Sequence, residues 1–127
     1  MKKNVARKWI GALRSGKYKQ IKNVLKRVNE NQIESFCALG VLCNLYQKEH
    51  PEDPIKEIKL DSKSKSGNKV QIGETTQTLP AKVRKWAGVR NSEAYIPEAR
   101  SSIPNLNDKG LSFESIANFI EKNQNKI

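Results

Sequence analysis

One short segment of the chain, RSGKYKQ, carries side chains that could bind a nucleotide. Arg14, Lys17 and Lys19 are cations that can hold phosphate groups, and the residues between them can supply free backbone N–H groups. Tyr18 offers a ring on which a base can stack, and Gln20 offers an amide for a base edge. A basic surface loop with Tyr18 partly buried would have the same composition, so both readings of this segment stay open.

Two other clusters combine residue types that suit a nucleotide. Arg84 and Arg90 flank Trp86 and could line a pocket beside its ring, although a Trp at this spacing is more often part of a core. Asn107 and Asp108 stand in the sequence NDKG, and such side chains can hydrogen-bond a base edge or a ribose. Asn, Asp and Gly are also common turn formers, so a simple turn is the alternative.

The positive charge of the chain is concentrated at one end. The chain has 24 Lys and Arg against 13 Asp and Glu, a formal net charge of +11. Ten of these cations lie in the first 29 residues, where no acid occurs: Lys2, Lys3, Arg7, Lys8, Arg14, Lys17, Lys19, Lys22, Lys26 and Arg27. Such a field attracts polyanions, meaning nucleic acid, free nucleotides or an anionic membrane face. The sequence therefore predicts an anionic partner.

Several classes of protein are disfavoured by motifs that the sequence lacks. It has no Walker loop, GxGxxG, HExxH or paired CxxC motif, and His50 is its only histidine. Cys37 and Cys43 are six residues apart, which is too far for a disulfide within one helix. Two reduced, buried thiols are typical of a cytoplasmic protein, and no apolar run is long enough to span a membrane. We expect a cytoplasmic protein without catalytic residues, metal, cofactor or membrane contact.

Hydrophobic periodicity predicts an α+β fold, a single small domain over residues 1–127 with about four helices and one or two short β-hairpins. The expected helices cover residues 3–14, 36–47 and 80–86 and a last segment from residue 112 onward. The expected hairpins fall within 24–36 and 58–73, with a mobile loop near 62–68 and an irregular segment at 90–110. The apolar share of 36% predicts a thin core, and therefore a homo-oligomer that buries further surface.

Particular residues should position these elements. Trp9 and Phe113 are assigned to the core, because each lies on the apolar face of its own predicted helix. Gly40 lies in the most apolar segment and should allow another element to approach its backbone closely. Gly16 is expected to end the first helix, and Ser112 to cap the last one.

Four stretches, taken together, resemble a known group of proteins. They are WIGALRSGKYKQ at 9–20, FCALGVLCNLY at 36–46, LPAKVRKWAGV at 79–89 and LNDKGLSFESIANFIE at 106–121. Their order resembles a widespread group of small bacteriophage proteins and is similar to the viral sponge proteins that sequester nucleotide second messengers of CBASS-type and Thoeris-type defence. This resemblance implies a cyclic oligonucleotide as ligand, a positive pocket with stacking groups and no catalytic machinery.

The leading hypothesis is thus a non-enzymatic protein that binds and sequesters phosphorylated nucleotides. Its site would be made of cations, one ring and three amide or carboxylate groups: Arg14, Lys17, Tyr18, Lys19, Gln20, Arg84, Arg90, Asn107 and Asp108. Two other readings stay open. The basic first helix could bind DNA or RNA, with a steep dependence on salt, or the protein could inhibit an acidic host protein.

Overall fold

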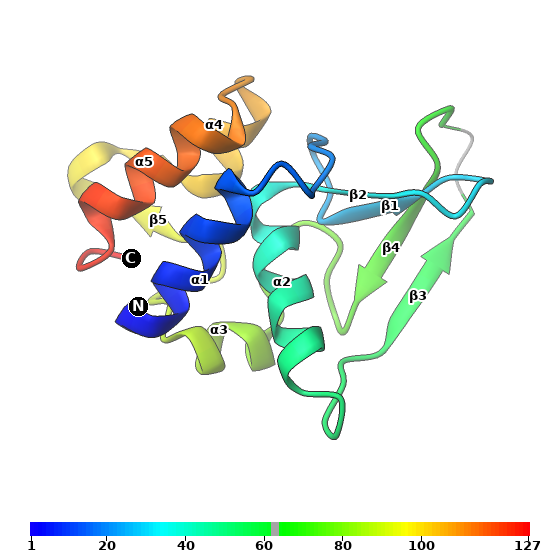
Figure 1. Cartoon of the computed structure of the whole chain (residues 1–127), viewed down its shortest axis with the longest axis horizontal. Coiled ribbons are helices and arrows are strands. Elements are labelled where there is room, and N and C mark those ends of the chain that lie inside the picture. The colour runs from blue at the N-terminus through cyan, green and yellow to red at the C-terminus, as the bar shows by residue number, and fades with distance from the viewer. Residues whose placement is uncertain (62–63) are drawn as a thin grey trace.

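The computed structural model describes residues 1–61 and 64–127, and its fold is α+β, as predicted. Five α-helices occur in this part of the chain, one more than expected. In chain order the elements are α1 (Lys3–Arg14), β1 (Lys26–Val28), β2 (Glu34–Phe36), α2 (Ala38–Glu49), β3 (Glu57–Leu60), β4 (Asn68–Ile72), α3 (Ala81–Ala87), β5 (Tyr95–Ile96), the 3-10 helix η1 (Pro97–Ala99), β6 (Ser101–Ser102), α4 (Ile103–Asp108) and α5 (Phe113–Asn123). Figure 1 shows α1, α3, α4 and α5 at one end of the molecule and the larger sheet at the other, with α2 between them.

The larger sheet is built from the two hairpins that the sequence predicts. Its strand order is β2-β1-β4-β3, and every pairing is antiparallel. The first hairpin pairs Arg27 with Ser35, and the second pairs Lys59 with Val70. Arg27 also pairs with Lys69, which joins the two hairpins into one sheet. A separate two-stranded sheet pairs β5 with β6.

Helix α1 is amphipathic and packs its apolar side against both α5 and α2. Val5, Trp9 and Leu13 recur at nearly every helical turn and are buried, so one side of α1 faces the core. The indole N–H of Trp9 donates to the carbonyl of Ala38 at 2.9 Å, which ties α1 to the start of α2. Gly16 follows the end of this helix with a φ of 74°, the conformation expected at such a stop.

Gly40 lies against the backbone of the segment before β1, as expected. A Cβ atom at this position would stand 1.8 Å from the carbonyl oxygen of Leu25, which no side chain can occupy. The thiol of Cys37 precedes α2 and accepts a hydrogen bond from the N–H of Gly40 at 3.4 Å. Helix α2 therefore sits in direct contact with the chain that leads into the sheet.

Three predictions about the second half of the chain need correction or lie outside the structure. The segment at 90–110, expected to be irregular, contains β5, β6 and α4. Helix α4 has six residues, too few for a periodic pattern, and it is fixed by Ser102, whose hydroxyl accepts from the N–H of Asn105. Pro80 immediately precedes α3 instead of forming its first residue. The expected mobile loop includes residues 62 and 63, which lie outside the described residues.

Helix α5 begins as predicted and closes the fold. The hydroxyl of Ser112 caps it by accepting from the N–H of Ser115 at 3.1 Å, and Phe113 is buried. Both chain ends reach the end of α3, where the N–H of Lys2 donates to Ala87 and the carbonyl of Ile127 accepts from Arg90. Within the described ranges, no helix is both long enough and apolar enough to cross a membrane.

Truncation of either core aromatic should destabilise the protein strongly. Trp9 is completely buried and Phe113 nearly so, and Trp9→Ala would also remove the hydrogen bond from the indole to the carbonyl of Ala38. We expect Trp9→Ala and Phe113→Ala each to lower the free energy of unfolding by about 3–5 kcal/mol, measured by chemical denaturation. Exposed Ile33→Ala serves as the control and should change it little. A stable Trp9→Ala protein would show that the ring is not part of the core.

Candidate functional site

The structure does not bring the nine sequence-predicted residues into one site, because several of them hold the fold. Asn107 has no exposed surface, and its carbonyl oxygen accepts from Gln20 at 3.0 Å and from the N–H of Ala38 at 3.2 Å. Its amide nitrogen donates to the carbonyl of Ile21 at 2.7 Å. The amide of Gln20 also donates to Leu111. The assignment of Asn107 to a ligand is therefore wrong, and Gln20 is engaged in positioning it.

The two arginines around Trp86 bind backbone carbonyl groups. Arg84 donates from Nε to Val89 at 3.1 Å and from Nη2 to the carbonyl of Arg90. Arg90 donates from Nη2 to the carbonyl of Asn125 at 3.0 Å. Trp86 is half-buried and packs against the core, as expected for this spacing. These arginines join α3 to the chain end, although both stay exposed.

Tyr18 is anchored, and a cation lies over its ring. Its hydroxyl donates to Asn44 at 2.7 Å, and its ring meets Phe36 edge to face at 5.2 Å between centroids. The ammonium of Lys48 stands 5.5 Å from the ring centroid, where a stacking base would lie. Lys17 and Tyr18 line a hollow of about 300 Å³, while Lys19 is exposed outside it. A base could stack there only after Lys48 moves.

A basic groove between α1 and α5 contains the predicted residue Arg14. Its volume is about 500 Å³, and it is lined by Lys3, Arg7, Ile10, Gly11, Arg14, Glu121 and Gln124. Lys3, Arg7, Gly11 and Arg14 lie three or four residues apart, so the helix places all four on one side. The sequence pattern contained this signal, but Lys3 and Arg7 were not among the predicted site residues.

The cations of the groove differ in how far their charge is offset. The guanidinium of Arg14 donates to Asn118 at 2.6 Å and pairs with Glu121 at 3.3 Å and Glu114 at 3.4 Å. These carboxylates, Glu121 above all, raise the pKa of Arg14 above its ordinary value. Lys3 and Arg7 form no ion pair with any described residue. The positive potential of the groove is therefore strongest toward the start of α1.

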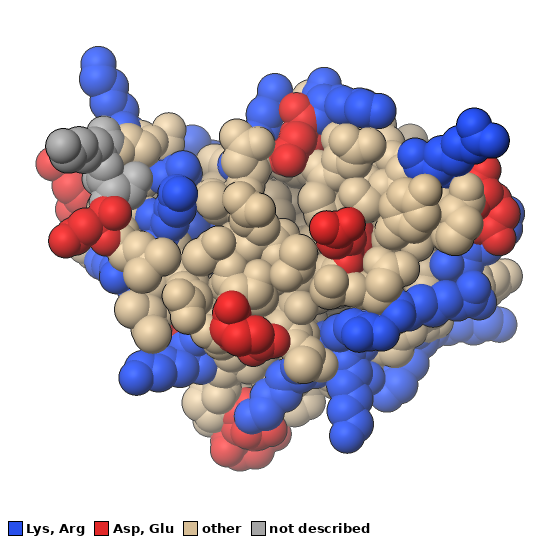
Figure 2. Space-filling model, turned by 180° about the vertical axis from the view of Figure 1, so that it is seen from behind, with Lys and Arg blue, Asp and Glu red and all other residues tan. Residues whose placement is uncertain are grey.

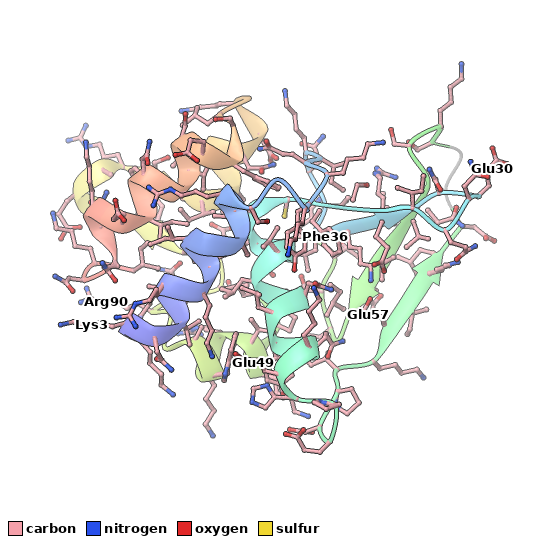
Figure 3. All side chains as sticks on the ribbon, viewed as in Figure 1. Lys3, Glu30, Phe36, Glu49, Glu57 and Arg90 are labelled. Carbon is pink, nitrogen blue, oxygen red and sulfur yellow. The ribbon has the colours of Figure 1, made fainter. Side chains whose placement is uncertain are left out.

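Further positive charge lies beside this end of α1. Arg90 lies at this end of the molecule, where its charge acts on the amino group of Met1 (Figure 3). Burial, and then the charge of Arg90, lower the pKa of the amino group of Met1. On the opposite face of the molecule, Lys and Arg side chains gather along the lower right edge, and the centre is mostly uncharged with isolated acids (Figure 2).

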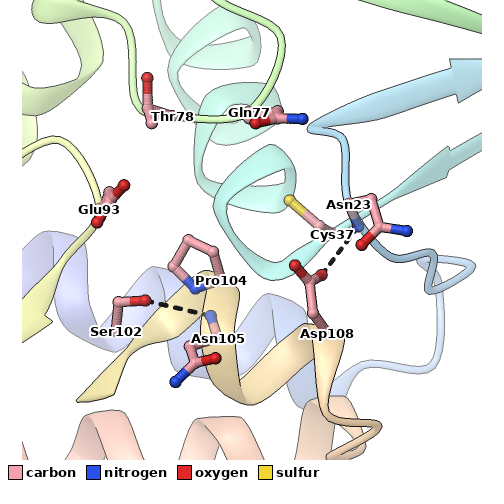
Figure 4. Close-up of a pocket in the computed structure, with 9 residues that line it drawn as sticks. All are labelled: Asn23, Cys37, Gln77, Thr78, Glu93, Ser102, Pro104, Asn105 and Asp108. Carbon is pink, nitrogen blue, oxygen red and sulfur yellow. Dashed lines mark hydrogen bonds between the residues drawn. The ribbon is translucent and has the colours of Figure 1, made fainter. Parts of the chain in front are cut away.

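A polar cleft contains the predicted residue Asp108. Its volume is about 340 Å³, and it is lined by Asn23, Cys37, Gln77, Thr78, Glu93, Ser102, Pro104, Asn105 and Asp108 (Figure 4). A carboxylate oxygen of Asp108 accepts from the N–H of Asn23 at 2.8 Å. Burial raises the pKa of the Cys37 thiol to about 11, so this thiol is protonated at neutral pH. The cleft and the basic groove share no lining residue.

Of the residues that line this cleft, the sequence analysis named Asp108 alone as a candidate. Five of the other lining residues come from four separate segments that only the fold brings together: Asn23, Cys37, Gln77, Thr78 and Glu93. The remaining three, Ser102, Pro104 and Asn105, lie on the same segment as Asp108, and none of the eight stands in a recognisable motif. Among residues 1–61 and 64–127, no three His, Cys, Asp or Glu side chains lie together so that they could hold a metal ion.

Comparison with known proteins places the chain in a family defined by its sequence alone. Residues 1–124 match the model of a domain of unknown function, DUF8296, so the chain belongs to this family. No curated protein and no solved structure matches it. The function must therefore be argued from the basic groove and the polar cleft themselves.

Removal of the Asn107 side chain should destabilise the fold more than removal of a neighbouring amide. In Asn107→Ala the buried N–H of Ala38 and carbonyl of Ile21 lose their partner. We expect the free energy of unfolding to fall by roughly 2–4 kcal/mol in urea denaturation. Asn105→Ala, on the same helix but exposed, is the matched control and should cost under about 1 kcal/mol. Equal losses in the two variants would contradict a structural role for Asn107.

Proposed function

We propose that the protein binds phosphorylated nucleotides in the groove between α1 and α5 and releases them unchanged. The observation that carries this proposal is the row of Lys3, Arg7 and Arg14 along one side of a groove of about 500 Å³. Ammonium and guanidinium groups are the side chains that bind phosphate oxygens most strongly. Since Lys3 and Arg7 have no carboxylate partner within the described ranges, their charge is available to a ligand.

The groove also has the shape that such a ligand needs. Its volume lies within the range of about 300–1,000 Å³ that is usual for small-molecule sites. Ile10 gives it an apolar part, and Gly11 leaves its floor open, because a Cβ atom there would meet no atom within 4 Å. A nucleotide can therefore place its phosphates at the cations and its base against the exposed backbone of α1.

We propose cyclic oligonucleotides as the ligands to test first, in line with the resemblance to sponge proteins. A sponge acts by mass action and must bind its ligand more tightly than the host effector does. This role would place the protein in the cytoplasm of the host cell. The prediction of a homo-oligomer stays open, and light scattering of the purified protein tests it.

A nucleic-acid strand is the alternative that one feature of the groove favours. Lys3 and Arg14 are eleven residues apart, so the row of cations extends over about 16 Å along the helix axis. A row of this length also fits successive phosphates of a strand. Binding of a strand would weaken steeply with salt, because each neutralised phosphate releases counterions.

Calorimetry with a panel of cyclic di- and trinucleotides tests the proposal, with duplex and single-stranded DNA measured at several salt concentrations. We expect at least one cyclic nucleotide to bind and to be recovered intact after heat denaturation of the complex. Recovery of a cleaved ligand would show that the protein is an enzyme. Tight binding of DNA alone, with a steep salt slope, would establish the nucleic-acid reading instead.

Two substitutions in the groove should test the contributions of its charge and of its shape to binding separately. Arg7→Glu reverses the charge of Arg7, which lies between Lys3 and Arg14 on the helix and has no ion-pair partner among the described residues. We expect the affinity for the phosphorylated ligand to fall about tenfold or more. Lys56→Glu makes the same change of charge outside the groove and is the control. A side chain added at Gly11 would enter open space, because a Cβ atom there meets no atom within 4 Å. Gly11→Met should therefore fill the groove and weaken binding without loss of thermal stability. Unchanged binding in both groove variants would exclude this groove.

Gly11→Ala should raise the stability of the protein. Glycine inside a helix costs about 0.5–1 kcal/mol relative to alanine, and at this position the added methyl group meets no neighbour. We expect the free energy of unfolding to rise by about that amount in chemical denaturation. A loss of stability would show that the backbone at Gly11 needs a conformation that alanine does not allow.

A further inference from the structure

We infer that the polar cleft around Asp108 is a second binding site, and that its ligand is an uncharged nucleobase that carries an exocyclic amino group. This inference does not rest on the proposed function of the basic groove, because the two hollows have no lining residue in common.

The charge of the cleft excludes phosphate groups. Although the chain has 24 Lys and Arg residues, none of those that the structure describes lines this cleft. Glu93 and Asp108 both line it, and neither carboxylate forms an ion pair with any residue that the structure describes. Figure 4 shows the two acids on different walls, with the cleft between them. Two carboxylates without cations repel a phosphate and accept hydrogen bonds from N–H groups.

The charge of the whole chain favours a neutral ligand over a cation. A formal net charge of +11 makes the approach of a cationic molecule unfavourable at low salt. A neutral molecule that is rich in N–H donors avoids both the repulsion of phosphates by the cleft and the repulsion of cations by the chain.

The cleft also requires an acceptor in its ligand. Ser102 is only 8% exposed, and its hydroxyl accepts from the N–H of Asn105 at 3.2 Å. The proton of this hydroxyl has no acceptor within the described part of the chain. An amino group beside a ring nitrogen or carbonyl oxygen, as on cytosine, adenine and guanine, offers the needed donors and acceptor together.

The remaining walls suit a flat ring with polar edges. Gln77 and Asn105 present amide groups that can donate or accept, and Pro104 presents an apolar surface. The volume of about 340 Å³ is at the lower end of the range for ligand pockets, as a single nucleoside requires.

One of the two acids of this cleft, Asp108, is held in place. Asp108 accepts from the N–H of Asn23, whose backbone has a φ of 71°, a conformation that is uncommon for a residue other than glycine. Asn107, directly before Asp108, is fixed by hydrogen bonds to buried backbone groups. The carboxylate is therefore oriented before a ligand arrives, which lowers the entropic cost of binding.

Pairs of nucleosides that differ by one amino group test the inference. Cytidine and uridine, and guanosine and inosine, lack phosphates and differ at the exocyclic amino group. Binding is followed by changes in the NMR spectrum of the protein. We expect at least one amino-bearing nucleoside to bind about tenfold more tightly than its partner, because the partner leaves a carboxylate unpaired. The corresponding 5′-monophosphate should bind more weakly than the nucleoside.

Two substitutions that keep the shape of the cleft complete the test. Asp108→Asn can still accept from the N–H of Asn23. Glu93→Gln removes the charge of an exposed side chain that forms no hydrogen bond with any described residue, so the fold should not depend on it. Each should weaken nucleoside binding about tenfold without a change in melting temperature. Glu98→Gln, outside the cleft, is the matched control, and Arg7→Glu in the basic groove should also leave nucleoside binding unchanged.

Three outcomes would overturn the inference. The first is that uridine or inosine binds as tightly as its amino-bearing partner. The second is that no nucleoside binds at millimolar concentration, and the third is that binding persists in both cleft variants. Failure here combined with binding of cyclic nucleotides in the groove would leave the proposed function intact. The reverse result would identify the cleft as the sole ligand site of the two.

Discussion

The buried amide of Asn107 is the constraint on which the arrangement of both halves of the molecule depends. Its carbonyl oxygen receives the N–H at the start of α2 and the side chain of Gln20, and its nitrogen binds the carbonyl of Ile21. Three segments that are distant in the sequence therefore meet at one side chain. Because every polar atom of this amide is buried, a shift of α4 would leave several hydrogen bonds unmade, which is costly away from water. This constraint fixes the position of Asp108 and with it one wall of the polar cleft.

Acids are distributed so that some cations are neutralised and others are not. Lys26 is buried in the larger sheet and pairs with Glu34 at 2.6 Å and with Glu57 at 2.7 Å. Burial lowers the pKa of Lys26, but the hydrogen bonds to these two carboxylates outweigh it, so the pKa lies above its ordinary value. Two further acids offset Arg14. No described acid pairs with Lys3 or Arg7. The two hollows consequently have opposite electrostatic character within one small protein.

Local patterns in the sequence were sufficient to predict most elements, but they could not predict how side chains far apart in the chain combine. The α+β class, the two hairpins and the helices containing Trp9 and Phe113 are confirmed, because periodicity and capping residues are local signals. Helix α4 was missed because six residues carry too little periodicity. Asn107 was assigned to a ligand because an amide in a polar turn gives no sign that it will be buried. Five of the eight other residues that line the cleft with Asp108 lie on four other segments, so no motif could have revealed the site as a whole.

Gly11 and Gly40 both lie inside helices, but their surroundings differ. In α2, Gly40 is required by packing, because any side chain would overlap the carbonyl of Leu25. In α1, Gly11 faces the open groove, and a side chain there would meet no atom within 4 Å. Packing therefore gives no reason for a residue that costs the helix about 0.5–1 kcal/mol relative to alanine. Access of another molecule to the backbone between Arg7 and Arg14 does give a reason, since phosphates or bases can then approach the helix closely. The glycine and the unpaired cations on the same side of α1 thus support one interpretation, a groove kept open for an anionic ligand.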